Sequence, residues 1–183
     1  MHITTEENDI AEVLFSEEAI QKRVKELAAQ LTKDYEGLDP LMVCVLKGAS
    51  FFYADLCRQI KCRIFMDFMA VSSYENESKT TGVVRIIKDL DKNITDRHVV
   101  IVDDIIDSGL TLKYLKDLLS ARKPASIKTI SLIEKQLGLK DRIVPDYNGF
   151  TMGDHFVVGY GLDYSDYYRN LPYIGILKPE TYQ

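Results

Sequence analysis

The sequence has 183 residues, of which 46% are hydrophobic and 28% charged, and this composition is typical of one globular domain with a sizeable core. Its formal net charge of −5 leaves no basic excess to neutralise nucleic-acid phosphates, so we expect no nucleic-acid partner. The apolar runs are shorter than the roughly 18 residues that a membrane span needs. Residues 1–12 also lack the apolar core of a signal peptide, so we expect a cytoplasmic protein with no membrane partner.

The predicted elements alternate between helices and short apolar strands. Up to residue 97 they are a helix from Ser16 to about Gly37, a strand over 41–46, a helix over 50–60, and strands over 63–71 and 83–87. After it they are a strand over 99–102, a helix over 110–121, and strands over 126–133 and 173–177. The polar segment 72–82 is predicted as a hairpin connection, and 146–150 as a turn. This alternation predicts an α/β fold with a mostly parallel twisted sheet flanked by helices.

One stretch combines a strand, a turn and a helix start. Val99–Val102 consists of β-branched residues only, which is typical of a strand buried on both faces. Asp107-Ser108-Gly109 then contains turn-forming residues. Backbone amides of such a loop, with the dipole of the helix that follows, can hold a phosphate group.

Three carboxylates, Asp103, Asp104 and Asp107, lie beside this anion-binding loop. They would repel a bare phosphate, so they suit a ligand that also carries hydroxyls, a divalent metal or a proton to be removed. A ribose 5-phosphate has this character. The alternative is that the aspartates only cap a helix and form a solvated turn.

The run from Val99 to Thr111 resembles the phosphoribosyl-pyrophosphate (PRPP) motif of the type I phosphoribosyltransferases, most closely that of the bacterial hypoxanthine-guanine group. Leu46-Lys47-Gly48 resembles that group's pyrophosphate loop, and residues 156–164 resemble its purine-pocket segment. The resemblance covers about residues 10–178. Asp103 replaces the common glutamate of the motif, which leaves open whether it contacts ribose directly or through a metal, and Ser108 replaces a threonine.

The resemblance implies a single domain over 1–183, with a small hood formed by about 1–15 and 135–183. It also implies a flexible flap over about 72–82, in which Ser73 and Tyr74 close over the site and exclude water. The Leu46–Lys47 peptide bond is a candidate for the cis form. Homodimers or homotetramers are usual in the group, so one of these is expected.

The implied reaction belongs to purine salvage. Phosphoribose passes from PRPP to N9 of hypoxanthine and/or guanine, giving IMP or GMP and pyrophosphate, with Mg²⁺ as cofactor and Asp107 as the general base. PRPP phosphate and ribose would be bound by Asp103, Asp104, Asp107, Ser108, Gly109, Leu110 and Thr111, and pyrophosphate by Lys47, Gly48 and Arg169. The 6-oxopurine would be bound by Lys135, Phe156, Val157 and Asp163, and Mg²⁺ by Asp103, Asp104 and Asp163.

Other functions remain open at this point. The sequence does not rank hypoxanthine, guanine and xanthine, whereas Lys135, as a donor, disfavours the amino group of adenine. A PRPP-binding regulator on the same fold would have a basic face or an added domain, and a receiver domain would leave the purine-pocket segment unexplained. Without the resemblance, Lys47 would be read as a surface residue of a turn, and Phe156 and Val157 as strand core. Cys44, Cys57 and Cys62 lack metal-ligand spacing, and His98 and His155 each precede an apolar run, so we assign these five residues no role.

Overall fold

Six strands form the main sheet of the computed structural model, which describes residues 8–76, 79–138 and 144–182. Their spatial order is β4-β3-β2-β5-β6-β7, and all neighbours are parallel except the antiparallel pair β3 and β4. The strands are β2 (Leu41–Leu46), β3 (Phe65–Asn76), β4 (Lys79–Lys88), β5 (His98–Ile106), β6 (Ser126–Lys135) and β7 (Tyr147–Met152). The predicted α/β class with a mostly parallel sheet is therefore confirmed.

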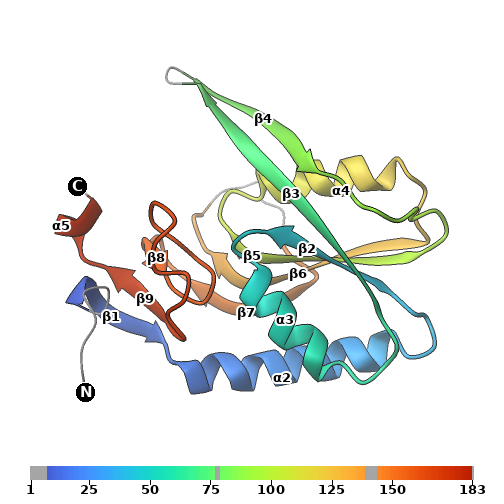
Figure 1. Cartoon of the computed structure of the whole chain (residues 1–183), viewed down its shortest axis with the longest axis horizontal. Coiled ribbons are helices and arrows are strands. Elements are labelled where there is room, and N and C mark those ends of the chain that lie inside the picture. Colours follow the sequence, from blue (N-terminus) through green and yellow to red (C-terminus); the bar gives the residue numbers. More distant parts are fainter. Residues whose placement is uncertain (1–7, 77–78, 139–143, 183) are drawn as a thin grey trace.

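Helices cover both faces of this sheet (Figure 1). On one face lie α2 (Glu17–Asp34) and α3 (Ser50–Gln59), and on the other lies α4 (Leu110–Ser120). Alternate residues of β2 separate the two cores: Met42 is buried with α2 and α3, whereas Val43 is buried with α4. Because β2 and β5 are buried on both faces, they are nearly continuous apolar runs, as parallel strands require.

A second, smaller sheet joins the two ends of the chain. It has the order β1-β9-β8, built from β1 (Ile10–Phe15), β9 (Ile174–Leu177) and β8 (Val157–Val158), all antiparallel. A short helix, α5 (Pro179–Tyr182), follows β9. Figure 1 shows this sheet to one side of the main sheet.

Two predictions about connections are wrong. Residues 147–150, predicted as turn, belong to β7, which pairs in parallel with β6 from Tyr147 to Met152. Most of the predicted connection over 72–82 is also strand, because β3 and β4 continue pairing as far as Asn76 and Lys79. In both segments, backbone pairing with a neighbouring strand outweighs a turn-like or polar composition.

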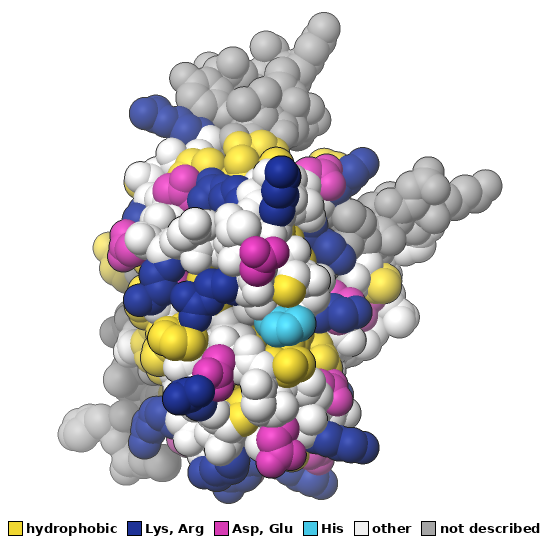
Figure 2. Space-filling model, turned by 90° about the vertical axis from the view of Figure 1, so that its right-hand side faces the viewer, with side chains coloured by type: hydrophobic (Ala, Val, Ile, Leu, Met, Phe, Trp, Pro, Cys, Tyr) yellow, Lys and Arg dark blue, Asp and Glu magenta, His cyan; other side chains and the backbone are white. Residues whose placement is uncertain are grey.

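The described residues include no helix that is both long and apolar enough to cross a bilayer. On the face shown in Figure 2, lysine and arginine side chains are interspersed with aspartate and glutamate and do not form one continuous basic patch.

Candidate active site

The loop between β5 and α4 surrounds a small cavity. Gly109 precedes α4 with φ of +79°, a left-handed conformation that glycine adopts without steric cost, and the amide of Leu110 donates to Ser108 Oγ at 3.4 Å. The cavity measures about 90 Å³ and is lined by Asp103, Ile105 to Leu112 and no other residues of the described chain. The whole loop that the sequence predicts as a phosphate cradle therefore lines this cavity, at the N-terminus of a helix.

A larger cavity of about 260 Å³ adjoins it. Its lining residues are Asp104, Ile105, Asp107, Lys135, His155, Phe156, Val157, Leu162 and Asp163. Ile105 and Asp107 line both cavities, so the two spaces meet at these residues. Asp107 is exposed, which leaves its carboxylate accessible to a ligand in either cavity.

Asp103, which is buried, and Asp104, which is half-buried, lie near the C-terminal end of β5, and each lines one of the two cavities. Burial and the neighbouring charge of Asp104 raise the pKa of Asp103 well above its usual range. Burial also raises the pKa of Asp104, although the amide of Ile105, which donates to Asp104 Oδ1 at 2.8 Å, and the charge of Arg169 oppose this shift. Two adjacent carboxylates, one buried and one half-buried, repel each other, and such a site favours a bound positive charge.

Two glycines bring the β2–α3 loop and the 159–162 loop against this pair. The Leu46–Lys47 peptide bond is cis, and Gly48 lies so close to Asp104 that a side chain on Gly48 would overlap Asp104 Oδ2. Gly161, with φ of +102°, lies against the carbonyl oxygen of Gly48 in the same way. These positions need glycine because other residues would separate the three segments.

Lys47 and Arg169 both form ion pairs with acidic side chains of the segment between β8 and β9. The Arg169 guanidinium donates to the Gly161 carbonyl at 2.7 Å and pairs with Asp163 at 2.8 Å and with Asp166 at 3.1 Å. Lys47 Nζ lies 3.0 Å from the same Asp166 carboxylate. Residues far apart in sequence thus place two cations on one carboxylate, and Arg169 also pairs with Asp163, which lines the larger cavity.

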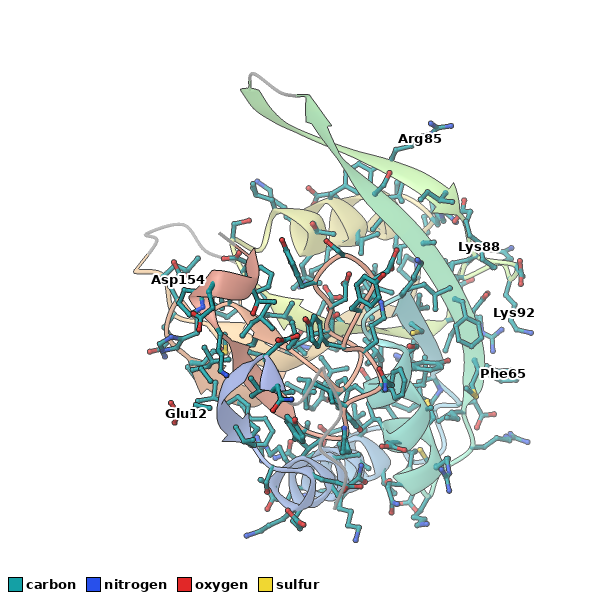
Figure 3. All side chains as sticks on the ribbon, turned by 60° about the vertical axis from the view of Figure 1, so that its left-hand side comes forward. Glu12, Phe65, Arg85, Lys88, Lys92 and Asp154 are labelled. Atoms are coloured by element: carbon teal, nitrogen blue, oxygen red, sulfur yellow. The ribbon has the colours of Figure 1, made fainter. Side chains whose placement is uncertain are left out.

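In that cavity a cation and an aromatic ring come from different elements. Lys135, at the end of β6, keeps only 13% of its side chain exposed and pairs with Asp154 at 3.1 Å. Asp154 projects on the side of the molecule that carries β1 and β9 (Figure 3). Phe156 is 40% exposed, and its ring meets that of Tyr164 edge-on at 5.7 Å between centroids. A cavity lined by a donor and a partly exposed aromatic ring suits a flat heteroaromatic ligand that carries an acceptor.

The structure brings together most residues that the sequence singled out. Ser73 and Tyr74 lie in β3, where the structure describes the backbone but not these two side chains. No group of three or more His, Cys, Asp or Glu side chains that could hold a metal ion occurs within the described ranges. Sequence reasoning missed His155 and Leu162 in the larger cavity and Asp166 beside the cations. Leu162 lies inside the predicted purine-pocket segment 156–164, whereas His155 and Asp166 are only close to it in the sequence, which was their one available signal.

Comparisons with known proteins give a consistent result. The sequence model of the family described as phosphoribosyl transferase domain matches residues 11–165. A hypoxanthine-guanine phosphoribosyltransferase of Bacillus subtilis is 54% identical over 176 residues, which cover 96% of this chain and 98% of that protein. A bifunctional protein TilS/HprT of Listeria innocua is 53% identical over 175 residues, 96% of this chain but 27% of that longer protein. The crystal structure of a hypoxanthine phosphoribosyltransferase from Staphylococcus aureus has a TM-score of 0.95 at 47% identity, with 100% of both chains covered.

Proposed function

Because the chain belongs to the phosphoribosyl transferase family, we propose that it catalyses a purine-salvage reaction. It transfers phosphoribose from PRPP to N9 of hypoxanthine and/or guanine and releases IMP or GMP and pyrophosphate. The names of its relatives in Bacillus subtilis and Staphylococcus aureus support these substrates. The observation that carries the proposal is the pair of adjoining cavities, one made by the phosphate-type loop and the other by Lys135 and Phe156, with Asp107 shared between them.

The smaller cavity would hold the 5-phosphate of PRPP. Amides from Asp107 to Thr111 and the hydroxyls of Ser108 and Thr111 supply its donors, and the start of α4 adds partial positive charge. Asp103 and Asp104 would bind the ribose hydroxyls and stabilise the positive charge that develops at C1 as pyrophosphate leaves.

Asp107 would act as general base. It lines both cavities, so one carboxylate can face the purine while its own loop holds the phosphate. In this role it takes the proton from purine N7 as N9 forms the bond to C1 and the C1–O bond to pyrophosphate breaks.

Arg169 and Lys47 would bind the leaving pyrophosphate. The forked donors of arginine suit phosphate oxygens, and the Lys47 ammonium adds a second positive charge. Gly48 lets this loop approach Asp104, so the departing pyrophosphate and the sugar are held by segments in direct contact.

Purine recognition would rest on Lys135 and the segment that begins at Phe156. Lys135 donates to an acceptor, which a 6-oxopurine has at C6 and adenine lacks. Phe156 offers a ring face for stacking, while the backbone of Val157 and the Asp163 side chain border the pyrimidine edge. An enzyme that depends on a buried donor rejects the wrong base by leaving that donor unpaired.

Mg²⁺ fits the donor set that this chain provides. Asp103 and Asp104 are hard oxygen donors whose burial favours a cation, and Mg²⁺ is usually held by one or two carboxylates together with substrate phosphates. Asp163, the third proposed ligand, lines the same cavity as Asp104. In the described residues it does not form a three-carboxylate cluster with Asp103 and Asp104 and is paired with Arg169 at 2.8 Å, so it would have to leave that ion pair to reach the metal. When bound, Mg²⁺ neutralises charge on PRPP and pyrophosphate.

The remaining proposals concern parts of the chain around the site. We propose that the small sheet, with neighbouring residues of about 1–15 and 135–183, forms a hood within a single domain, and that residues 72–82 form the flap. We also propose a cytoplasmic enzyme that assembles as a homodimer or homotetramer, as is usual in the family.

The test is nucleotide formation from PRPP and Mg²⁺ with hypoxanthine, guanine, xanthine and adenine in parallel. We expect turnover with hypoxanthine or guanine and none with adenine. PRPP binding without turnover on any of the four bases would favour the PRPP-binding regulator instead.

A further inference from the structure

The two cations proposed to bind pyrophosphate share one carboxylate oxygen of the chain itself. Asp166 Oδ1 lies 3.0 Å from Lys47 Nζ and 3.1 Å from the Arg169 guanidinium. Lys47 lies in the loop after β2, whereas Asp166 and Arg169 belong to the segment between β8 and β9. A pyrophosphate oxygen bound by both cations would have to take the place of Asp166 Oδ1, because the two cations share that oxygen.

A tight turn presents this carboxylate. Ser165 and Asp166 have φ values of +52° and +66°, and Tyr164 and Tyr167 bond to each other's backbone on either side, as in a two-residue hairpin turn. The amide of Asp166 donates to Asp163 Oδ2 at 2.8 Å, which ties the turn to a second acidic residue of the site. Asp166 is therefore held beside the cations by its backbone and not only by its ion pairs.

Its charge is present under working conditions. An aspartate carboxylate is ionised at neutral pH, so Asp166 presents a negative charge to Lys47 and Arg169. Both Lys47 and Asp166 are about 70% exposed, so their ion pair is weak enough for a dianionic or trianionic ligand to displace it.

We propose that Asp166 is an internal competitor of pyrophosphate: its carboxylate holds Lys47 and Arg169 between turnovers and returns to them as the product leaves. This inference rests on the proposed function, because it assumes that these cations bind pyrophosphate. It assigns Asp166 no part in bond making or breaking. Its effect is to weaken retention of a highly charged product and to keep the two cations assembled for the next substrate.

The experiment compares Asp166→Asn with the wild-type enzyme and with Asp117→Asn. Asparagine tolerates the left-handed conformation of this turn, so the fold should be retained. Asp117→Asn makes the same change of charge on an exposed residue of α4. Each protein is titrated with inorganic pyrophosphate in the presence of Mg²⁺ by calorimetry, and product inhibition by pyrophosphate is measured in the nucleotide-forming assay.

We expect Asp166→Asn to bind pyrophosphate about 3- to 10-fold more tightly than wild type, as the loss of two exposed ion pairs predicts. The difference should shrink as ionic strength rises, and Asp117→Asn should match the wild type. A damaged site would bind pyrophosphate less tightly, so the direction of the change separates competition from structural support.

Unchanged or weaker pyrophosphate binding in Asp166→Asn overturns the inference. If wild-type enzyme forms nucleotide and only this comparison fails, the proposed function stands and the role of Asp166 falls. If wild-type enzyme neither forms nucleotide nor binds pyrophosphate, both fall together.

Discussion

The Asp104 carboxylate occupies the space that a side chain at Gly48 would need. The strand end that carries the acidic pair and the loop that carries Lys47 are therefore in direct contact, through the Asp104 side chain and the Gly48 backbone. This contact joins the proposed ribose site to the proposed pyrophosphate site.

The first prediction is that Gly48→Ala severely reduces catalysis. The new methyl group would overlap Asp104 Oδ2, so either the carboxylate or the loop must move, and a displacement of about 1 Å at a reacting centre can lower turnover about 100-fold. Steady-state kinetics with varied PRPP measures the effect.

Gly37→Ala is the control that measures the loss of stability when a glycine away from the site is replaced. Gly37 has φ of +78° in the turn after α2 and open space around it, so alanine there costs about 1–2 kcal/mol of unfolding free energy. We expect lower stability with unchanged kcat. Equal kinetic loss in both variants would refute the argument from close approach.

The second prediction concerns Lys135. Lys135→Met removes the donor for the C6 oxygen and should lower kcat/KM for hypoxanthine and guanine about 10- to 100-fold, because the loss of a charge-assisted hydrogen bond costs about 1.5–3 kcal/mol. Asp154→Asn breaks the exposed ion pair but keeps the donor, and it should change kcat/KM by less than about threefold. Similar losses in the two variants would count against Lys135 as the base-recognising group.

Much of this architecture follows from local sequence patterns, because the apolar runs of β2, β5 and β6 and the turn before α4 are contiguous. The edge strand β7 could not be predicted in this way. Its glycine, Gly149, is required because the Leu132 carbonyl of β6 leaves no room for a side chain, and Arg23 of α2 binds the Asn148 and Gly149 carbonyls. These contacts join segments that are distant in the sequence, so no local pattern reveals them. Locally, the dipeptide Asn148-Gly149 is typical of a turn.

The candidate site divides in the same way. The phosphate-type loop from Asp103 to Thr111 is continuous in sequence, so its residues could be identified together. The position of Asp166 between Lys47 and Arg169 depends on the pairing of a hairpin turn with a loop more than a hundred residues earlier. No local pattern encodes that approach.

The third prediction concerns acid stability and Asp146, which lies outside the site. Burial opposes ionisation of Asp146, but hydrogen bonds from Lys128 at 2.7 Å and from the amide and hydroxyl of Thr129 outweigh it and lower the pKa. A lowered pKa in the folded state means that the carboxylate stabilises the fold above its ordinary pKa of about 4, and this stabilisation is lost as the pH falls through the folded value.

Asp146→Asn should therefore reduce the unfolding free energy by about 1–3 kcal/mol at pH 7, and the difference from wild type should narrow toward pH 3. Urea unfolding at several pH values measures it. Asp117→Asn provides the exposed aspartate for comparison. A difference that stays constant from pH 7 to pH 3 would contradict the assigned cause.

The most direct test of the account is the Asp107→Asn variant, because the account rests on one carboxylate shared by the phosphate-type cavity and the purine-type cavity. We expect turnover with hypoxanthine or guanine to fall about 10²- to 10⁴-fold, the usual contribution of a general base, while PRPP affinity measured by calorimetry stays within a few-fold of wild type. Full turnover in Asp107→Asn would contradict a role as general base. A loss of PRPP affinity that by itself explains the lower turnover would also contradict it.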